Sequence, residues 1–170
     1  LGAQLFLLLL HLTDAYVLDS FGHYHTITVA AAHAMGAPPK LFTHWYWSVP
    51  IVTTLGGLVA GMLIYWLAPE TEGHGTDAAL IAFHRNNGRM RARVPFVKIL
   101  VSAITIGSGG SGGREGPTAQ IASGIGAIAG SLFKLSDEER RLVILIGMAA
   151  GLSAIFKSPL GTAIFAVEIL

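Results

Sequence analysis

Long apolar runs alternate with short polar or glycine-containing breaks along almost the whole chain. The longest run covers residues 46–67, YWSVPIVTTLGGLVAGMLIYWL, and contains no charged residue. A helix needs about 20 apolar residues to cross a bilayer, and this run has aromatic residues at both ends, where the membrane interfaces would lie. It is therefore predicted to be a membrane-spanning helix. Its Gly57-x-x-x-Gly61 spacing would permit the close approach of a second helix.

The other apolar runs are shorter, and glycine, proline or charged residues interrupt them. Several are too short to cross a bilayer upright. Broken helices at membrane depth are tolerated where they are buried in protein or line a cavity, and transporters use them to direct backbone N–H groups at anions. The pattern predicts an all-α membrane protein, a bundle of short, broken helices. The shorter runs lie at 1–18, 94–106, 116–133, 142–156 and 159–170.

Two of the predicted helices have recognisable starts. Proline suits the first turn of a helix, so Pro117 predicts that one helix begins within 115–117. Ser136 is followed three residues later by Glu139. This is the spacing of a capping box, and the pair predicts the start of the next helix.

Composition supports the membrane assignment. Hydrophobic residues make up 52% of the chain and charged residues 12%. An ordinary soluble domain has roughly 25% charged residues, about twice this share. The net charge of +1 gives no reason to expect binding to nucleic acid. There is no cysteine, and His23-x-His25 supplies only two ligands. Since a metal site needs three or four ligands, no metal site is expected.

The basic residues predict an orientation in the membrane. Residues 84–98 contain five of the eleven Lys and Arg residues, and residues 134–141 contain three more. The long loop 19–45 contains only Lys40, together with four histidines. Because cytoplasmic loops are enriched in Lys and Arg, the two basic segments are predicted to face the cytoplasm and the long loop to face outward. This arrangement places residues 107–113 towards the outer half of the membrane.

The most unusual segment is GSGGSGGREGP at 107–117, which places adjacent charges on a glycine-rich break. One interpretation is a dinucleotide-binding enzyme, because Gly107-x-Gly109-x-x-Gly112 matches the glycine fingerprint and follows the β-branched run VSAITI. The flanking segments are apolar on all faces, however, which does not suit a Rossmann unit. A second interpretation is a tight helix crossing that carries a local Arg114–Glu115 ion pair.

A third interpretation makes this segment an anion site, because charges at membrane depth are costly and indicate function. The first N–H groups of the helix that begins near Pro117 have no intrahelical partner, and the helix dipole adds positive potential there. Glycines leave the backbone accessible, so that a small anion can approach these N–H groups. Glu115 would then be a carboxylate at an anion site. A carboxylate that competes with the permeant ion acts as a gate.

Three blocks of sequence together resemble the CLC family of chloride channels and chloride/proton antiporters. GREGP at 113–117 is similar to the family signature. GMAAGLSAIFKSPLGTAIFAVEIL at 147–170 resembles the next block, and GHGTD at 73–77 stands where the family usually has GSGIP. The order and spacing of the blocks fit over about 46–170. Residues 1–45, a first helix with a long outer loop, match only by position.

The resemblance implies a fold of two inverted repeats, of which residues 1–170 would form a partial transmembrane domain: the N-terminal half only, without a soluble domain. It implies a homodimer in the cell membrane, with a pore in each subunit. The protein would transport chloride, with or without protons, and would be neither an enzyme nor dependent on a cofactor. Glu115 would be the gate, Lys98 would add positive potential to the pore, and Arg114 would raise the anion concentration at the outer mouth. The implied anion-binding residues are His74, Gly75, Gly113, Arg114, Glu115, Gly116 and Pro117.

Four positions depart from the family pattern. His74 replaces the serine of the central site, and its charge can change within the physiological pH range. Asp77 follows where the family has proline. It is expected either to cap a helix or, as an anion at the site, to disfavour chloride. Ile169 replaces the inner glutamate of proton-coupled members, so coupling by the usual route is not expected. Lys157 stands where asparagine is more usual. Channel and antiporter both stay open, as do chloride, bromide, fluoride and nitrate as the anion.

Overall fold

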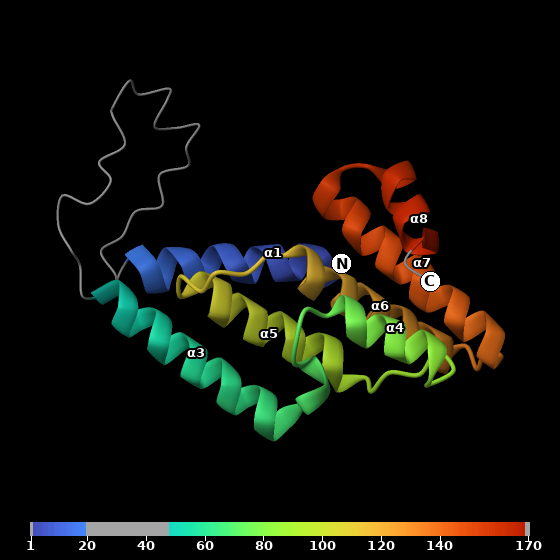
Figure 1. The fold of residues 1–170 in the computed structure, drawn as a ribbon, viewed down its shortest axis with the longest axis horizontal. Helices are drawn as coiled ribbons and strands as arrows, with labels where there is room; N and C mark the ends of the chain where they lie inside the picture. Colours follow the sequence, from blue (N-terminus) through green and yellow to red (C-terminus); the bar gives the residue numbers. More distant parts are fainter. Residues whose placement is uncertain (1, 20–47, 169–170) are drawn as a thin grey trace.

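The computed structural model describes residues 2–19 and 48–168, and every regular element within them is helical (Figure 1). The predicted all-α class is confirmed. A π-helical turn, Asp14–Asp19, follows the first helix, and a 3₁₀ turn, Pro69–Thr71, follows α3. The α-helices are α1 Gly2–Thr13, α3 Ser48–Leu67, α4 Thr76–His84, α5 Arg93–Gly107, α6 Glu115–Leu132, α7 Asp137–Phe156 and α8 Pro159–Glu168.

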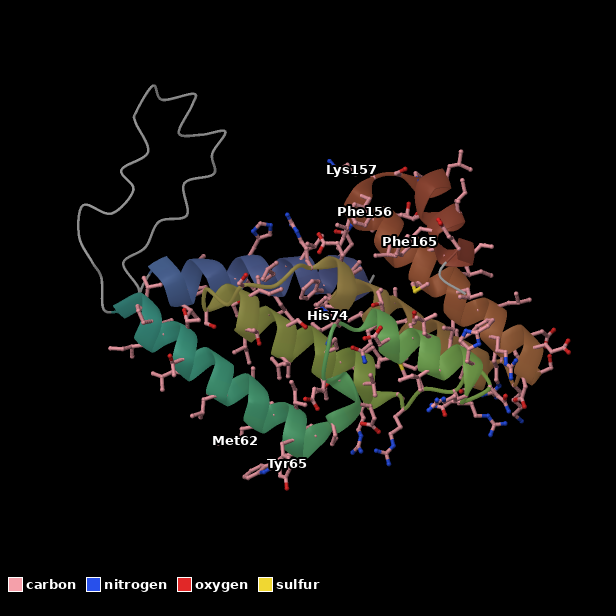
Figure 2. All side chains as sticks on the ribbon, viewed as in Figure 1. Met62, Tyr65, His74, Phe156, Lys157 and Phe165 are labelled. Carbon is pink, nitrogen blue, oxygen red and sulfur yellow. The ribbon has the colours of Figure 1, made fainter. Side chains whose placement is uncertain are left out.

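Helix α3 confirms the long apolar helix that the sequence predicts. Within the described residues, one helix is long and apolar enough to cross a membrane by its length and composition, over Val49–Leu67. Almost none of this segment is buried, and Met62 and Tyr65 are exposed on it (Figure 2). A Cβ added at Gly57 or Gly61 would have no neighbour within 4 Å. No helix in the described chain therefore uses the small-residue spacing of α3 as a contact.

Helices α6 and α7 form a closely packed hairpin joined by residues 133–136. A Cβ at Gly126 would lie 2.6 Å from the Val143 carbonyl oxygen, and one at Gly147 would lie 2.5 Å from the Ala122 carbonyl oxygen. Neither position can accept a larger residue without movement of the backbone. The glycines thus allow the two helices to pack backbone against backbone, as small residues do in membrane helices.

Local predictions for the helix starts were mostly correct. Helix α6 begins at Glu115, within the predicted range, and Ser136 and Glu139 form the predicted capping box at the start of α7. The expectation that Asp77 caps a helix was wrong. The N-cap of α4 is Gly75, with a φ of +93°, and Asp77 lies in the first turn of the helix. A positive φ suits glycine, because glycine has no Cβ to clash with the backbone.

Residues 101–106, which the dinucleotide-binding interpretation expects to form a strand, are helical. The run VSAITI lies within α5, because it continues an apolar segment that packs against neighbouring helices on several sides. A dinucleotide fingerprint requires a strand before its glycines. The nucleotide-binding alternative therefore fails on structure as well as on composition.

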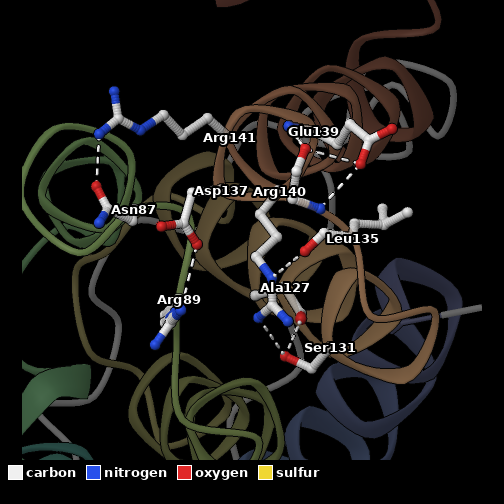
Figure 3. A network of polar contacts seen from close by, with 10 residues as sticks. Asn87, Arg89, Ala127, Ser131, Leu135, Asp137, Glu139, Arg140 and Arg141 are labelled. Carbon is white, nitrogen blue, oxygen red and sulfur yellow. Dashed lines mark hydrogen bonds and ion pairs between the residues drawn. The ribbon is translucent and has the colours of Figure 1, made fainter.

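Polar contacts fix the loop after α4 to the α6–α7 hairpin (Figure 3). Arg89 pairs with Asp137 at 3.2 Å, and Arg141 donates a hydrogen bond of 2.6 Å to the Asn87 side-chain oxygen. Arg140 donates two more hydrogen bonds, to groups at the C-terminal end of α6 and in the turn that follows. The three arginines come from the segments that the charge pattern predicts to be cytoplasmic. Arg89 and Arg141 join the two segments at one end of the hairpin, and Arg140 holds the second segment to the end of α6.

Candidate functional site

The N-termini of α4 and α6 meet at the centre of the fold. A Cβ added at Gly75 would lie 2.5 Å from the Gly116 carbonyl oxygen. A Cβ added at Gly116 would overlap the carbonyl oxygen of His74. Both positions therefore require glycine, since a side chain would force the two helix starts apart. The contact brings GHGTD and GREGP together, although the whole of α5 separates them in the sequence.

Neither of these two helix starts has a side-chain cap, whereas α7 carries a complete capping box at the protein surface. The first N–H groups of an α-helix have no intrahelical carbonyl partner. At α4 and α6 these donors are left without a side-chain acceptor, and both helix dipoles add positive potential at the same place. Such an arrangement is suited to a bound anion.

An open cavity of about 830 Å³ lies beside the paired helix starts. Helix α5 contributes the polar residues Lys98, Ser102 and Thr105 to its wall, together with the apolar residues Val101 and Ile106. The two glycine-containing segments and the end of α3 complete the wall. Their lining residues are Ile64, Thr71, Gly73, His74, Thr76, Ser111, Gly112, Gly113, Glu115, Gly116 and Pro117.

A second cavity, of about 520 Å³, lies on the side of α7 and α8. Its walls include Phe156, at the end of α7, and Phe165, on α8 (Figure 2). The remaining lining residues from these two helices and their turn are Leu152, Ser158, Gly161 and Thr162. Glu115 and Thr76 line both the larger and the smaller cavity. Glu115 thus lines two cavities, of which the larger has the more polar wall.

Lys98 holds the loop that leads into α4. The residue is 4% exposed, and Nζ donates hydrogen bonds of 2.7 Å to the Thr71 carbonyl and 2.9 Å to the Gly73 carbonyl. No carboxylate of the described residues pairs with this ammonium group. Its positive charge is therefore compensated only by carbonyl dipoles, and it adds positive potential to the wall of the larger cavity.

Most of the residues predicted for an anion site line the larger cavity. These are His74, Gly113, Glu115, Gly116, Pro117 and Lys98. Gly75 does not line the cavity but is buried against Gly116. Arg114 is exposed at the N-cap of α6 and lines neither cavity. It forms no ion pair with Glu115, so the local ion-pair interpretation of these two residues lacks the contact it requires.

The sequence interpretation missed the polar side of α5. Ser102 and Thr105 lie four and seven residues after Lys98 on this helix, which is otherwise apolar after Arg93. Residues at these spacings share one side of a helix. This spacing was a signal that could have predicted their shared orientation. The histidines of the loop 20–47 and Ile169 lie outside the described residues.

Comparison with known proteins identifies the family. The family model described as voltage gated chloride channel matches residues 56–170. The chain belongs to the voltage-gated chloride channel (CLC) family. The resemblance of the three sequence blocks is thereby confirmed, and with it the membrane nature of the fold, because CLC proteins are integral membrane proteins. CLC proteins are channels and transporters rather than enzymes.

Several relatives match most of this chain. An H(+)/Cl(-) exchange transporter ClcA from Klebsiella pneumoniae is 34% identical over 139 residues, which cover 79% of this chain and 29% of the relative. ClcA from Citrobacter koseri is 37% identical over 119 residues, which cover 69% of this chain and 25% of the relative. An uncharacterised protein from Methanocaldococcus jannaschii is 37% identical over 122 residues, which cover 72% of this chain and 29% of the relative. The chain thus spans between a quarter and three tenths of the length of these relatives.

Proposed function

We propose that this chain forms part of a transmembrane anion pathway, with chloride as the transported ion and Glu115 as the gate. One observation carries the proposal: Glu115 lines both cavities at the place where two uncapped helix N-termini meet. The donors and dipoles that favour an anion also favour the Glu115 carboxylate. A charged Glu115 therefore competes with the permeant anion, and neutralisation or displacement of its side chain lets the anion pass.

The electrostatics of the larger cavity support an anion as the transported species. Lys98 supplies a buried positive charge, and each of the two helix starts supplies a partial positive charge. Asp77, which would oppose an anion, is exposed and lines neither cavity. The departure from the family pattern at Asp77 is therefore compatible with anion transport.

The family and the relatives also suggest the whole assembly. We propose that residues 1–45 and 46–170 belong to one partial transmembrane domain, and that the full protein is a homodimer of two-repeat subunits in the cell membrane. The relatives named as H(+)/Cl(-) exchange transporters favour an antiporter. Because Ile169 cannot hand on a proton, coupling is proposed to be weak or to use another route.

A second candidate function is transport of another small anion, such as fluoride or nitrate. The observation that favours it is His74, which lines the larger cavity in place of the usual serine. An imidazole offers a ring N–H donor where a hydroxyl would stand, and it can carry a positive charge. Flux measurements with chloride, fluoride and nitrate under the same conditions distinguish the two candidates.

The gate is tested with the full-length protein in liposomes. Glu115→Gln and Glu115→Ala should transport anions at the native rate or faster, and the part of the pH dependence of the flux that comes from Glu115 should disappear. Glu138→Gln is a matched control, because Glu138 also lies in the first turn of a helix but at the opposite end of the hairpin. If Glu115→Ala folds as a dimer and conducts none of the three anions, Glu115 is not the gate.

A further inference from the structure

The end of α7 lies beside the start of α6. The connection between these two extensively packed helices is short, so they run antiparallel. They contain 18 and 20 residues, and are therefore similar in length. Glu115 and Phe156 thus lie at the same end of the hairpin, and both line the smaller cavity. The basic segment 134–141 lies at the opposite end.

Lys157 lies next to the smaller cavity in the chain, although it is not itself among the residues that line this cavity. It follows Phe156 and precedes Ser158, both of which line this cavity, in the turn that joins α7 to α8 (Figure 2). The residue is exposed, and its backbone N–H is bonded to the Ser153 carbonyl at 2.9 Å. No carboxylate in the described part of the chain pairs with its ammonium group.

Backbone geometry does not explain why this residue is a lysine. Lys157 has a φ of +53°, at a position that helices usually fill with glycine or asparagine. Lys134, just after the end of α6, has the same φ of +53°. Both lysines therefore have the left-handed backbone conformation. Only Lys157 of the two is flanked in the chain by residues that line the smaller cavity.

The mostly apolar wall of the smaller cavity allows the charge of Lys157 to act on anions inside the cavity. Among the described residues that line the smaller cavity, Glu115 is the one ionisable residue, and the rest of the wall is mostly apolar. Apolar walls focus the field of a nearby charge into the cavity, and a nearby positive charge raises the local concentration of anions.

We propose that Lys157 draws anions into the smaller cavity towards Glu115, and thereby sets the apparent affinity of the pathway on this side. The proposal rests on the proposed function, because it requires anions to pass Glu115. It assigns a role to a residue at which this chain departs from the family pattern.

The test measures anion flux by the full-length protein in liposomes as a function of anion concentration. Lys157→Asn removes the charge and suits the left-handed backbone. At about 10 mM ionic strength, set with an impermeant salt, it should raise the half-saturating anion concentration about twofold and leave the maximal rate unchanged. At about 1 M ionic strength, where the Debye length is about 3 Å, the difference should vanish.

Two further variants complete the test. Lys157→Arg keeps the charge and should behave as the native protein at both ionic strengths. Lys134→Asn is the matched control, because Lys134 has the same backbone conformation but lies at the far end of α6, and it should also behave as the native protein. If Lys157→Asn and Lys134→Asn have the same half-saturating concentration at low ionic strength, while flux still depends on Glu115, the role of Lys157 is overturned. Loss of Glu115-dependent flux in the native protein would instead overturn the proposed function.

Discussion

Gly116, in the first turn of α6, packs directly against the backbone carbonyl of His74, just before α4 begins. This contact joins the two segments that carry the candidate site. It leaves no room for a Cβ, and the neighbouring atoms are backbone atoms that cannot rotate away. The site therefore depends on glycine at a position where a helix would ordinarily favour alanine.

We expect Gly116→Ala to destabilise the full-length protein by more than about 2 kcal/mol, because overpacking against backbone is not relieved by a rotamer change. Gly75→Ala should behave similarly, since Gly75 has both a positive φ and a close backbone neighbour. Gly57→Ala is the control, and its Cβ would lie in open space on α3. Thermal unfolding in detergent measures all three. Equal melting temperatures for the three variants would contradict the close contact.

Lys98→Met should loosen the loop before α4. The substitution removes the hydrogen bonds to the Thr71 and Gly73 carbonyls. Both acceptors are then left unpaired, at a cost of about 1–3 kcal/mol. Anion affinity should fall as well, because the cavity loses a positive charge. Lys134→Met is the control at an exposed position and should leave stability nearly unchanged. If Lys98→Met matches Lys134→Met in melting temperature and in chloride affinity, Lys98 neither holds the loop nor contributes to the anion site.

His74 should make anion binding depend on pH. Calorimetry in a Glu115→Gln background, where the gate no longer titrates, should show several-fold tighter anion binding at acidic than at neutral pH, because a protonated imidazole attracts the anion. Lys98 and Glu115 are the other charged residues that line the same cavity within the described chain, and Asp77 lies nearby in the sequence. Adding His74→Ser to this background should leave little pH dependence. Identical pH profiles with and without His74 would rule out the histidine as a ligand.

The cap of α7 should contribute stability that depends on pH. The backbone N–H and the hydroxyl of Ser136 donate hydrogen bonds to Glu139, and these bonds lower the pKa of Glu139 below its usual value. A lowered pKa means that this contribution is complete above the pKa of the unfolded chain and is lost as the pH falls through the folded-state value. Glu139→Gln should remove this acid-side dependence of the melting temperature, and Glu138→Gln should retain it. Equal acid-side slopes for the two variants would contradict the capping contact.

Much of the fold follows from local sequence. The uncharged run 46–67 is long enough to form α3 whatever packs beside it. Ser136 with Glu139 supplies its own cap to α7, and Pro117 similarly indicated the start of α6. These features depend on residues within a few positions of one another, so that hydrophobic spacing and capping chemistry predict them without knowledge of the fold.

The candidate site was only partly visible in the sequence, because its geometry depends on contacts between distant segments. The GHGTD and GREGP blocks identify the residues, but only packing decides that Gly116 meets His74, that Gly75 lies behind the cavity, and that Arg114 lines neither cavity. Asp77 could have capped α4 by residue type alone. The chain instead enters the helix through the left-handed conformation of Gly75, which places Asp77 inside the first turn. Sequence determined which segments are helical and where glycine and charge interrupt them. Tertiary structure decided that two uncapped helix starts face the same cavities, because burial and backbone contact arise only when the helices pack together.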